Sequence, residues 1–457
     1  MIFAMQKNNL LIIFFTLILA LIIYTSELSN IQSHTLFITL ITAMLWVTEK
    51  LPIPVSSLIP LGTFPLFGIL SSKQVAQSYG SPLILLLLGG FMLSTAMSQT
   101  HTHRYIANKV IGFIGTQSQT RLLLSFMLTA ALLSMWISNT ATTLMLLPIA
   151  LAIVENNSCK KFSTILLLGI AYSASIGGIA TPIGTPPNLI LIQTLQNSGQ
   201  PDIGFINWMK QVAPVLFIIL PVTYLYLRLF INNKAIDYDL KKLSITSSQK
   251  KILILFLITA ILWMTRVEPF GGWRELFNFP TANDASVALL AVVVLFTLGD
   301  GKGHKIMDWE AVNKIPWGIL LLFAGGITIA TAFQETGLSH LIASKLTFLN
   351  DYPIWLIVGI ICISVSFLTE ITSNTATTAV LMPILLSTAE AINVNPIILM
   401  LPATISASFA FMMPVATAPN AIIFSSGKVP IKEMIKTGIG LNLIGALILT
   451  VYFSITQ

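Results

Sequence analysis

A short polar motif occurs twice in this chain, each time inside a long apolar stretch. The hexapeptide Ser-Asn-Thr-Ala-Thr-Thr at residues 138–143 recurs unchanged at residues 373–378. Its hydroxyl and amide groups donate and accept hydrogen bonds without carrying charge, so these residues are suited to bind a ligand. One Ser-Asn-Thr would usually be only a helix cap. An identical pair in apolar surroundings indicates a binding site to which both copies contribute.

Two further pairs of segments follow the same order along the chain. The glycine pair at residues 89–90 corresponds to a second pair at residues 325–326, and the segment 182–188 corresponds to 414–420. Prolines in the second pair of segments are expected to break apolar helices into two halves. The glycines are expected to be close-packing sites between helices. The chain therefore contains one structural unit twice.

The composition tells us which environment these units occupy. Apolar residues make up 55% of the 457 positions and charged residues only 9%, too few charges to cover a surface that faces water. Apolar runs recur along the whole length, at residues 10–24, 36–47, 83–96, 212–230, 252–264, 287–298 and 319–332. With their neutral neighbours most of these are long enough to cross a bilayer. The first lacks a signal-peptidase cleavage pattern, so residues 1–33 are expected to remain as an N-terminal transmembrane helix.

The basic residues predict how the chain is oriented. If the N-terminus is cytoplasmic and the chain reverses at each run, the inner loops receive all of the 24 Lys and Arg residues except Lys73, Lys210, Arg266, Arg274 and Lys345. This bias follows the positive-inside rule. It predicts a multi-pass membrane protein, surrounded by lipid, with a cytoplasmic N-terminus. The short connecting loops and the lack of any targeting extension suit a bacterial cell inner membrane. The net charge of +7 is scattered over short loops and forms no basic stripe, which argues against a nucleic-acid partner.

Counting spans places the two motifs in opposite orientations. The first Ser-Asn-Thr is approached from the inside and the second from the outside, so the repeats, residues 34–231 and 252–457, are predicted to be inverted. A polar, Lys-rich segment at 232–251 is expected to be the cytoplasmic linker between them. Residues 122–154 are too long for one span and are followed by basic residues on the side where they began. A re-entrant helical hairpin with its tip at residues 138–140 fits both facts, and a second is expected with its tip at 373–375.

Hairpin tips and broken helices together predict a bound anion and a bound cation. Non-helical backbone at membrane depth must lie against protein or a watery cavity. Each tip exposes a helix N-terminus, whose N–H groups and dipole attract an anion. Two tips facing each other would suit a substrate with a negative group at each end, such as a dicarboxylate. Carbonyl and hydroxyl oxygens in the same segments are suitable ligands for Na⁺.

At these positions the chain resembles the divalent anion/sodium symporter family. The resemblance rests on the paired Ser-Asn-Thr motifs and on Gly-Thr-Pro-Pro-Asn at 184–188 and Pro-Val-Ala-Thr-Ala-Pro-Asn at 414–420, and it covers essentially the whole chain. It implies an all-α polytopic membrane protein with about 11 transmembrane helices, two re-entrant hairpins and a homodimeric assembly. It also implies scaffold helices at 34–118 and 252–350, transport segments at 119–231 and 351–457, and elevator-type alternating access.

The resemblance also implies roles for individual residues. Substrate carboxylates would contact Ser138, Asn139, Thr140, Thr185, Ser373, Asn374, Thr375 and Thr417. One Na⁺ site would use Ser134, Ser138, Asn139 and Gly184, and the other Thr369, Thr372, Asn374 and Ala416. Ser134 and Thr369 keep their oxygens one helical turn before each motif, which favours Na⁺ coupling. Ala418 replaces a proline common in the family, which leaves the choice among succinate-type dicarboxylates, citrate and other anions open.

Other functions remain as alternatives. A Na⁺-independent exchanger of dicarboxylates or citrate would use the same anion pocket, and a sulfate transporter would differ in substrate. A channel would need a continuous pore, and an enzyme would need a nucleophile–base pair or an acidic metal motif that the sequence lacks. Glu370, three residues before the second motif, corresponds to Met135 in the first half. Its carboxylate could tune cation binding, take part in proton coupling or serve only as a hydrogen-bonding group.

Overall fold

The fold is given by a computed structural model, which describes residues 28–155, 160–200, 203–232, 234–236, 243–300 and 303–455. The expected N-terminal transmembrane helix, residues 1–33, lies almost entirely outside these ranges, as does part of the expected linker. The described residues are helical, with two isolated β-bridges and no strand.

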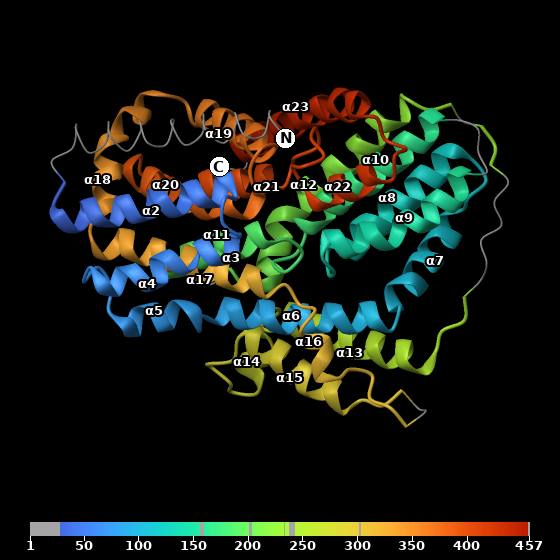
Figure 1. Cartoon of the computed structure of the whole chain (residues 1–457), viewed down its shortest axis with the longest axis horizontal. Helices are drawn as coiled ribbons and strands as arrows, with labels where there is room; N and C mark the ends of the chain where they lie inside the picture. The colour runs from blue at the N-terminus through green and yellow to red at the C-terminus, as the bar shows by residue number, and fades with distance from the viewer. Residues whose placement is uncertain are drawn as a thin grey trace.

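Figure 1 shows the helices as a bundle in which some long elements run along the long axis of the view and others are inclined to it. The helices of the first half are α2 (Asn30–Thr48), α3 (Ile53–Ser56), α4 (Leu58–Leu66), α5 (Ser72–Tyr79), α6 (Pro82–Gln99), α7 (Thr102–Ile114), α8 (Gln119–Ser134), α9 (Asn139–Glu155), α10 (Lys160–Gly178), α11 (Pro186–Asn197) and α12 (Gly204–Arg228). Those of the second half are α13 (Ser247–Met264), α14 (Gly272–Leu276), α15 (Asp284–Thr297), α16 (Trp309–Val312), α17 (Trp317–Glu335), α18 (Leu338–Lys345), η1 (Thr347–Asp351), α19 (Ile354–Thr369), α20 (Asn374–Ala391), α21 (Ile397–Ala407), α22 (Ala418–Ser425) and α23 (Ile431–Ile455).

Length and hydropathy of these helices confirm a polytopic helical membrane protein. Within the described residues, seven helical segments are long and apolar enough to cross a bilayer, and several shorter apolar helices accompany them. The shorter ones include α8 and α9 on either side of the first polar motif, α19 before the second motif, and α21, which is the first half of the second broken helix. The expected total of about 11 spans remains a prediction.

Local sequence determines where several helices begin and end. Ser29, Ser71 and Thr246 each form a capping box with a glutamine three residues later, which satisfies backbone donors at the start of α2, α5 and α13. At the other end of α2, Glu49 takes a left-handed conformation and stops the helix. α7 ends just before Gly115, whose φ of +101° favours glycine.

The two polar motifs lie at turns between consecutive helices, as the hairpin prediction requires. In the first half the turn joins α8 to α9, and in the second it joins α19 to α20. Each turn covers the four residues before the motif's asparagine, so it begins slightly earlier than predicted. Asn139 and Asn374 are the first residues of the returning helices. The difference arises because the serine before each asparagine acts as a helix cap.

Helices broken in the middle lie beside the hairpins. The chain leaves helical geometry between α10 and α11 and again between α21 and α22, at both predicted breaks. α9 packs against α10 of its own half and α22 of the other half, whereas α20 packs against α21 of its own half and α11 of the other. The two halves therefore interlock around a common centre, near which α10 is buried along almost its whole length.

The remaining helices surround this centre, and the paired glycines explain some of their packing. α6 packs on α15, and α17 packs on α4 and α5. A Cβ added at Gly89 would lie 2.7 Å from the Ala288 Cβ on α15, and one added at Gly325 would lie 2.8 Å from the Ser57 carbonyl oxygen. The first glycine of each pair is thus a close-packing site, as predicted. Gly90 has more room, since its nearest neighbour would be 3.9 Å away.

Candidate functional site

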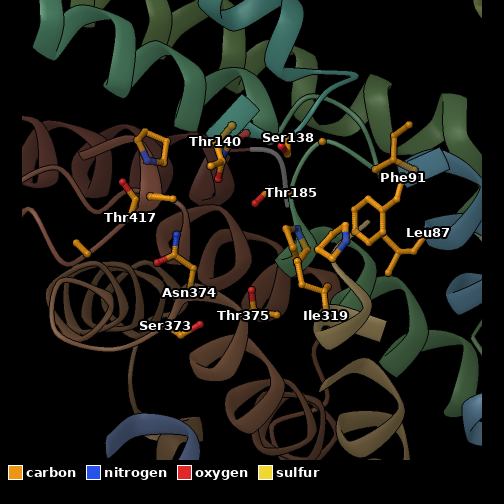
Figure 2. Close-up of a pocket in the computed structure, with 18 of the residues that line it drawn as sticks. Leu87, Phe91, Ser138, Thr140, Thr185, Ile319, Ser373, Asn374, Thr375 and Thr417 are labelled. Carbon is orange, nitrogen blue, oxygen red and sulfur yellow. The ribbon is translucent and has the colours of Figure 1, made fainter. Parts of the chain in front are cut away.

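One cavity of about 790 Å³ lies where the hairpin turns meet the broken helices. All eight residues predicted to contact substrate line it: Ser138, Asn139, Thr140, Thr185, Ser373, Asn374, Thr375 and Thr417. Figure 2 shows the first motif on one side of this space and the second motif on the opposite side, with Thr185 and Thr417 between them. Leu87, Phe91 and Ile319 form an apolar wall. The structure therefore brings together residues that are far apart in the sequence.

Four helices begin at the cavity wall. α9 and α20 begin at Asn139 and Asn374, and α11 and α22 begin at Pro186 and Ala418; all four of these residues line the cavity. The first turn of a helix leaves backbone N–H groups without intrahelical partners, and the helix dipole makes this end positive. Four such ends around one space create a site for negative charge.

The serines of the two motifs act as helix caps and also face the cavity. The Ser138 Oγ accepts a hydrogen bond from the Ala141 N–H at 3.2 Å, and the Ser373 Oγ accepts one from the Ala376 N–H at 3.5 Å. A hydroxyl that accepts in this way can still donate its own proton. The capping and binding interpretations of these serines are therefore compatible.

Behind each motif, two side-chain oxygens lie unusually close together. The Ser134 hydroxyl donates to the Asn139 Oδ1 at 2.5 Å, and the Thr369 hydroxyl lies at the same distance from the Asn374 Oδ1. Ser134 and Thr369 are fully buried and do not line the cavity. Each asparagine thus reaches the cavity and a buried hydroxyl. Neutral oxygens arranged in this way could hold a hard monovalent cation, which is the ligand set predicted for Na⁺.

Glycines make room for the first of these oxygen clusters. A Cβ at Gly178, the last residue of α10, would lie 2.6 Å from the Asn139 Oδ1. One at Gly184 would lie 2.4 Å from the Gly178 carbonyl oxygen. The end of α10 can therefore approach Asn139 only because residue 178 is glycine, and residue 184 can approach the end of α10 only because it is glycine. Gly184 also lines the cavity, and its role in cation binding remains a prediction.

The second cluster uses its predicted residues differently. The Thr372 hydroxyl donates to the Leu368 carbonyl at 2.8 Å and lies 2.6 Å from the Thr377 hydroxyl, so it is already engaged twice and its backbone carbonyl oxygen is a second atom that it could offer to a cation. Ala416, which corresponds to Gly184, is buried and lines the cavity. Its contribution would come from the backbone.

Two asparagines for which no role was predicted donate hydrogen bonds to the unwound backbone of the broken helices. The Asn188 amide donates to the carbonyls of Gly178 and Thr181 at 3.1 and 2.7 Å. The Asn420 amide donates to the carbonyls of Ala410 and Met413, both at 3.0 Å. Both side chains are fully buried. The sequence feature that could have identified them is their shared position, the last residue of the paired segments 182–188 and 414–420.

Few charged residues line the cavity. Among the described residues that line it, only Glu49 and Lys314 carry a formal charge, and both are exposed to solvent. Neither of these residues was predicted at the site from the sequence, and nor was Trp136, which also lines the cavity. Glu370 is buried and does not line the cavity.

Comparison with known proteins agrees with this geometry. A family model described as "Citrate transporter" matches residues 43–401. These residues include most of both repeats, both Ser-Asn-Thr motifs and the first of the two broken-helix segments, 182–188. This chain belongs to the citrate transporter family. Two curated relatives are sodium-dependent dicarboxylate transporters named SdcS. The one from Staphylococcus saprophyticus is 37% identical over 95% of this chain and 89% of its own length, and the one from Staphylococcus aureus (strain bovine RF122) is 38% identical over 92% and 85%.

Solved structures support the same fold at greater distance. The citrate transporter chain superposes on the Alcanivorax borkumensis YdaH transporter with a TM-score of 0.62 and 14% identity, covering 93% of this chain and 98% of that one. It superposes on Neisseria gonorrhoeae MtrF with a TM-score of 0.61 and 13% identity, covering 96% and 97%. The resemblance to the divalent anion/sodium symporters is confirmed by the SdcS relatives, and the protein is a membrane transporter.

Proposed function

We propose that this protein carries small dicarboxylates of the succinate, malate and fumarate type across the membrane together with Na⁺. The observation that carries this proposal is the placement of two identical motifs on opposite sides of one cavity, each at the start of a helix. Each end of a dianion would receive hydroxyl, amide and backbone N–H donors from its own motif. A monoanion would engage only one of them.

The oxygen clusters behind the motifs are the reason for proposing Na⁺ as the coupling ion. The substrate brings two negative charges to a site lined by few charged residues, so bound cations would offset the charge that has to cross the bilayer. The first cation would use Ser134, Ser138, Asn139 and Gly184, and the second Thr369, Thr372, Asn374 and Ala416. The sodium dependence named in both SdcS relatives supports this assignment. Because Asn139 and Asn374 belong to both substrate and cation sites, binding of each ligand would favour the other.

The two groups of helices would have different parts in transport. Residues 119–231 and 351–457 would form the moving transport segments, and residues 34–118 and 252–350 the scaffold, which would pair with a second copy in a homodimer. Interlocking of α9 with α22 and of α20 with α11 supports movement of the transport segments as one body. Elevator-type movement of that body would expose the cavity to each side in turn. The N-terminus would be cytoplasmic, in the inner membrane.

Uptake by proteoliposomes tests the proposal. Labelled succinate is followed with an inward gradient of Na⁺, K⁺ or protons, into vesicles that are empty or preloaded with dicarboxylate. Symport predicts uptake into empty vesicles with Na⁺ only, and its loss in the double variant Asn139→Ala, Asn374→Ala. Na⁺-independent uptake that needs internal dicarboxylate would instead identify an exchanger. Transport of citrate or sulfate in place of succinate would change the substrate, for which Ala418 at the cavity wall is the residue to examine.

A further inference from the structure

Glu370 is a buried carboxylate that has no counterpart in the first half of the molecule. It lies in the turn between α19 and α20, next to Thr369, and is 2% exposed. The corresponding residue of the first half is Met135. A charge at this depth needs compensating contacts, because burial of an unpaired carboxylate is very unfavourable.

Three donors meet this carboxylate. The Met412 N–H donates to Oε1 at 2.8 Å, the Met413 N–H donates to Oε2 at 2.9 Å, and the Asn442 amide of α23 donates to Oε1 at 2.7 Å. Both carboxylate oxygens accept, which is the hydrogen-bonding pattern of the ionised form. Glu370 therefore ties the hairpin turn to the unwound segment between α21 and α22 and to α23.

The unwound segment explains why such a tie is needed. It covers residues 408–417 and is longer than the first break, residues 179–185. Side chains hold its carbonyls, since the Ser366 hydroxyl donates to the Phe409 oxygen and the Tyr172 hydroxyl donates to the Phe411 oxygen, both at 2.8 Å. The consecutive N–H groups of Met412 and Met413 need an acceptor with two oxygens, which a carboxylate provides.

The two halves consequently surround their oxygen clusters with different charge. In the first half, the Thr181 hydroxyl donates to the Met135 carbonyl at 2.5 Å, so a neutral contact joins the turn to the break. In the second half, the same connection is made by the Glu370 carboxylate. In a poorly solvated site a negative charge raises the affinity for a nearby cation. The Thr369–Asn374 cluster therefore has a source of cation affinity that the Ser134–Asn139 cluster lacks.

We propose that Glu370 is a positioning residue of the second cation site, and that through it the two cation sites are unequal, with the second site binding Na⁺ more tightly. The carboxylate holds residues 412–413 against the turn, so that Thr369, Asn374 and the Ala416 backbone stay together, and it adds the charge that favours a cation there. This inference rests on the proposed Na⁺-coupled function.

The test compares Glu370→Gln with Met135→Gln, which places the same amide at the corresponding position of the first half. Glutamine keeps the size of the side chain but removes the charge and turns an NH₂ donor towards one of the N–H groups. For Glu370→Gln we expect the Na⁺ concentration at half-maximal succinate uptake to rise by about tenfold, the size of one lost charge-assisted hydrogen bond. At saturating Na⁺ the KM for succinate should stay within about twofold of wild type, since the motifs are intact. Met135→Gln should leave the Na⁺ dependence unchanged.

Thermal stability gives a readout that does not depend on transport. Na⁺ added without substrate should raise the Tm of the wild type and of Met135→Gln, and should raise that of Glu370→Gln much less. A purely structural role would lower the Tm of Glu370→Gln equally with and without Na⁺ and leave its half-saturating Na⁺ unchanged, and that result would overturn the inference. Na⁺-independent uptake by the wild type would instead overturn the proposed function.

A second variant covers the case in which Glu370→Gln does not fold. Asn442→Ala keeps the carboxylate and both of its backbone donors but removes the α23 contact, including the acceptor of the Phe411 N–H at 3.3 Å. The inference predicts a smaller rise in half-saturating Na⁺, by about threefold. An unchanged Na⁺ dependence in Asn442→Ala would contradict it.

Discussion

Gly178→Ala should damage binding while sparing the fold. The added methyl would lie 2.6 Å from the Asn139 Oδ1 and 3.1 Å from its Nδ2, whereas ordinary contacts begin near 3.4 Å. The amide must therefore move by about 0.8 Å. Because the clash is with the end of a side chain, the amide can turn away and the backbone can remain in place.

The cost of that movement falls on ligand binding. The Ser134–Asn139 hydrogen bond at 2.5 Å would be lost or lengthened, and a hydrogen bond contributes about 0.5–1.5 kcal/mol net. The amide would also be displaced from both of its proposed ligands, and a misplacement of about 1 Å can cost about 100-fold in rate. We expect uptake at low succinate to fall by about 10- to 100-fold, with a rise in half-saturating Na⁺.

Kinetics in proteoliposomes, normalised to folded protein, measure this effect. Gly90→Ala is the matched control: it adds one methyl to another helical glycine, which itself lines the cavity, but the nearest atoms would be Ile183 methyl carbons at 3.9 Å. We expect near-wild-type kinetics from the control. The reasoning is refuted if Gly178→Ala keeps the wild-type KM for succinate and the wild-type Na⁺ dependence, or if Gly90→Ala is equally impaired.

Three further predictions concern stability and pH. Asn420→Ala removes the amide that donates to two carbonyl oxygens inside the broken helix, and it should lower the stability by about 1–3 kcal/mol. The loss would be seen as a lower Tm, and an unchanged Tm would argue against this role. Arg266, 2% exposed, donates to Asp284 at 2.7 Å; Arg266→Met should cost about 3–5 kcal/mol by removing the cationic partner of a partly buried carboxylate. Adding Asp284→Asn should restore much of the Tm, and no recovery would contradict the pairing. Burial lowers the pKa of His103 in the folded protein below its value in the unfolded chain. The contribution of neutral His103 to the stability of the fold is therefore fully present above the unfolded pKa, and it is lost as the pH falls through the folded pKa. The Tm of His103→Gln should therefore fall less on acidification, and an equal fall would rule this group out.

Much of the architecture could be predicted from sequence because the determining signals are local. Apolar length, proline position and the repeated motif predicted the membrane fold, both turns and both breaks. The turns begin earlier than expected, because Ser138 and Ser373 cap the returning helices and leave the asparagines as the first helical residues. These differences are small compared with the length of the helices.

The contacts that sequence could not reveal join residues far apart in the chain. Glu370 meets backbone donors of residues 412–413, and Tyr172 of the first half donates to the Phe411 carbonyl of the second. Cross-packing of α9 with α22 and of α20 with α11 is similarly remote in sequence. Periodicity and propensity describe neighbours along the chain, so partners of this kind become visible only in the fold.

Equilibrium binding of labelled succinate to purified protein tests the central claim most directly, because it asks whether two motifs hold one dianion with Na⁺. The measurement uses wild type, Asn139→Ala and Asn374→Ala, each with Na⁺ and with K⁺ in its place. The account predicts binding by the wild type in Na⁺ only, and loss of binding in either single variant, since each end of the substrate depends on its own motif. Tight binding in K⁺, or wild-type affinity in either single variant, would contradict it.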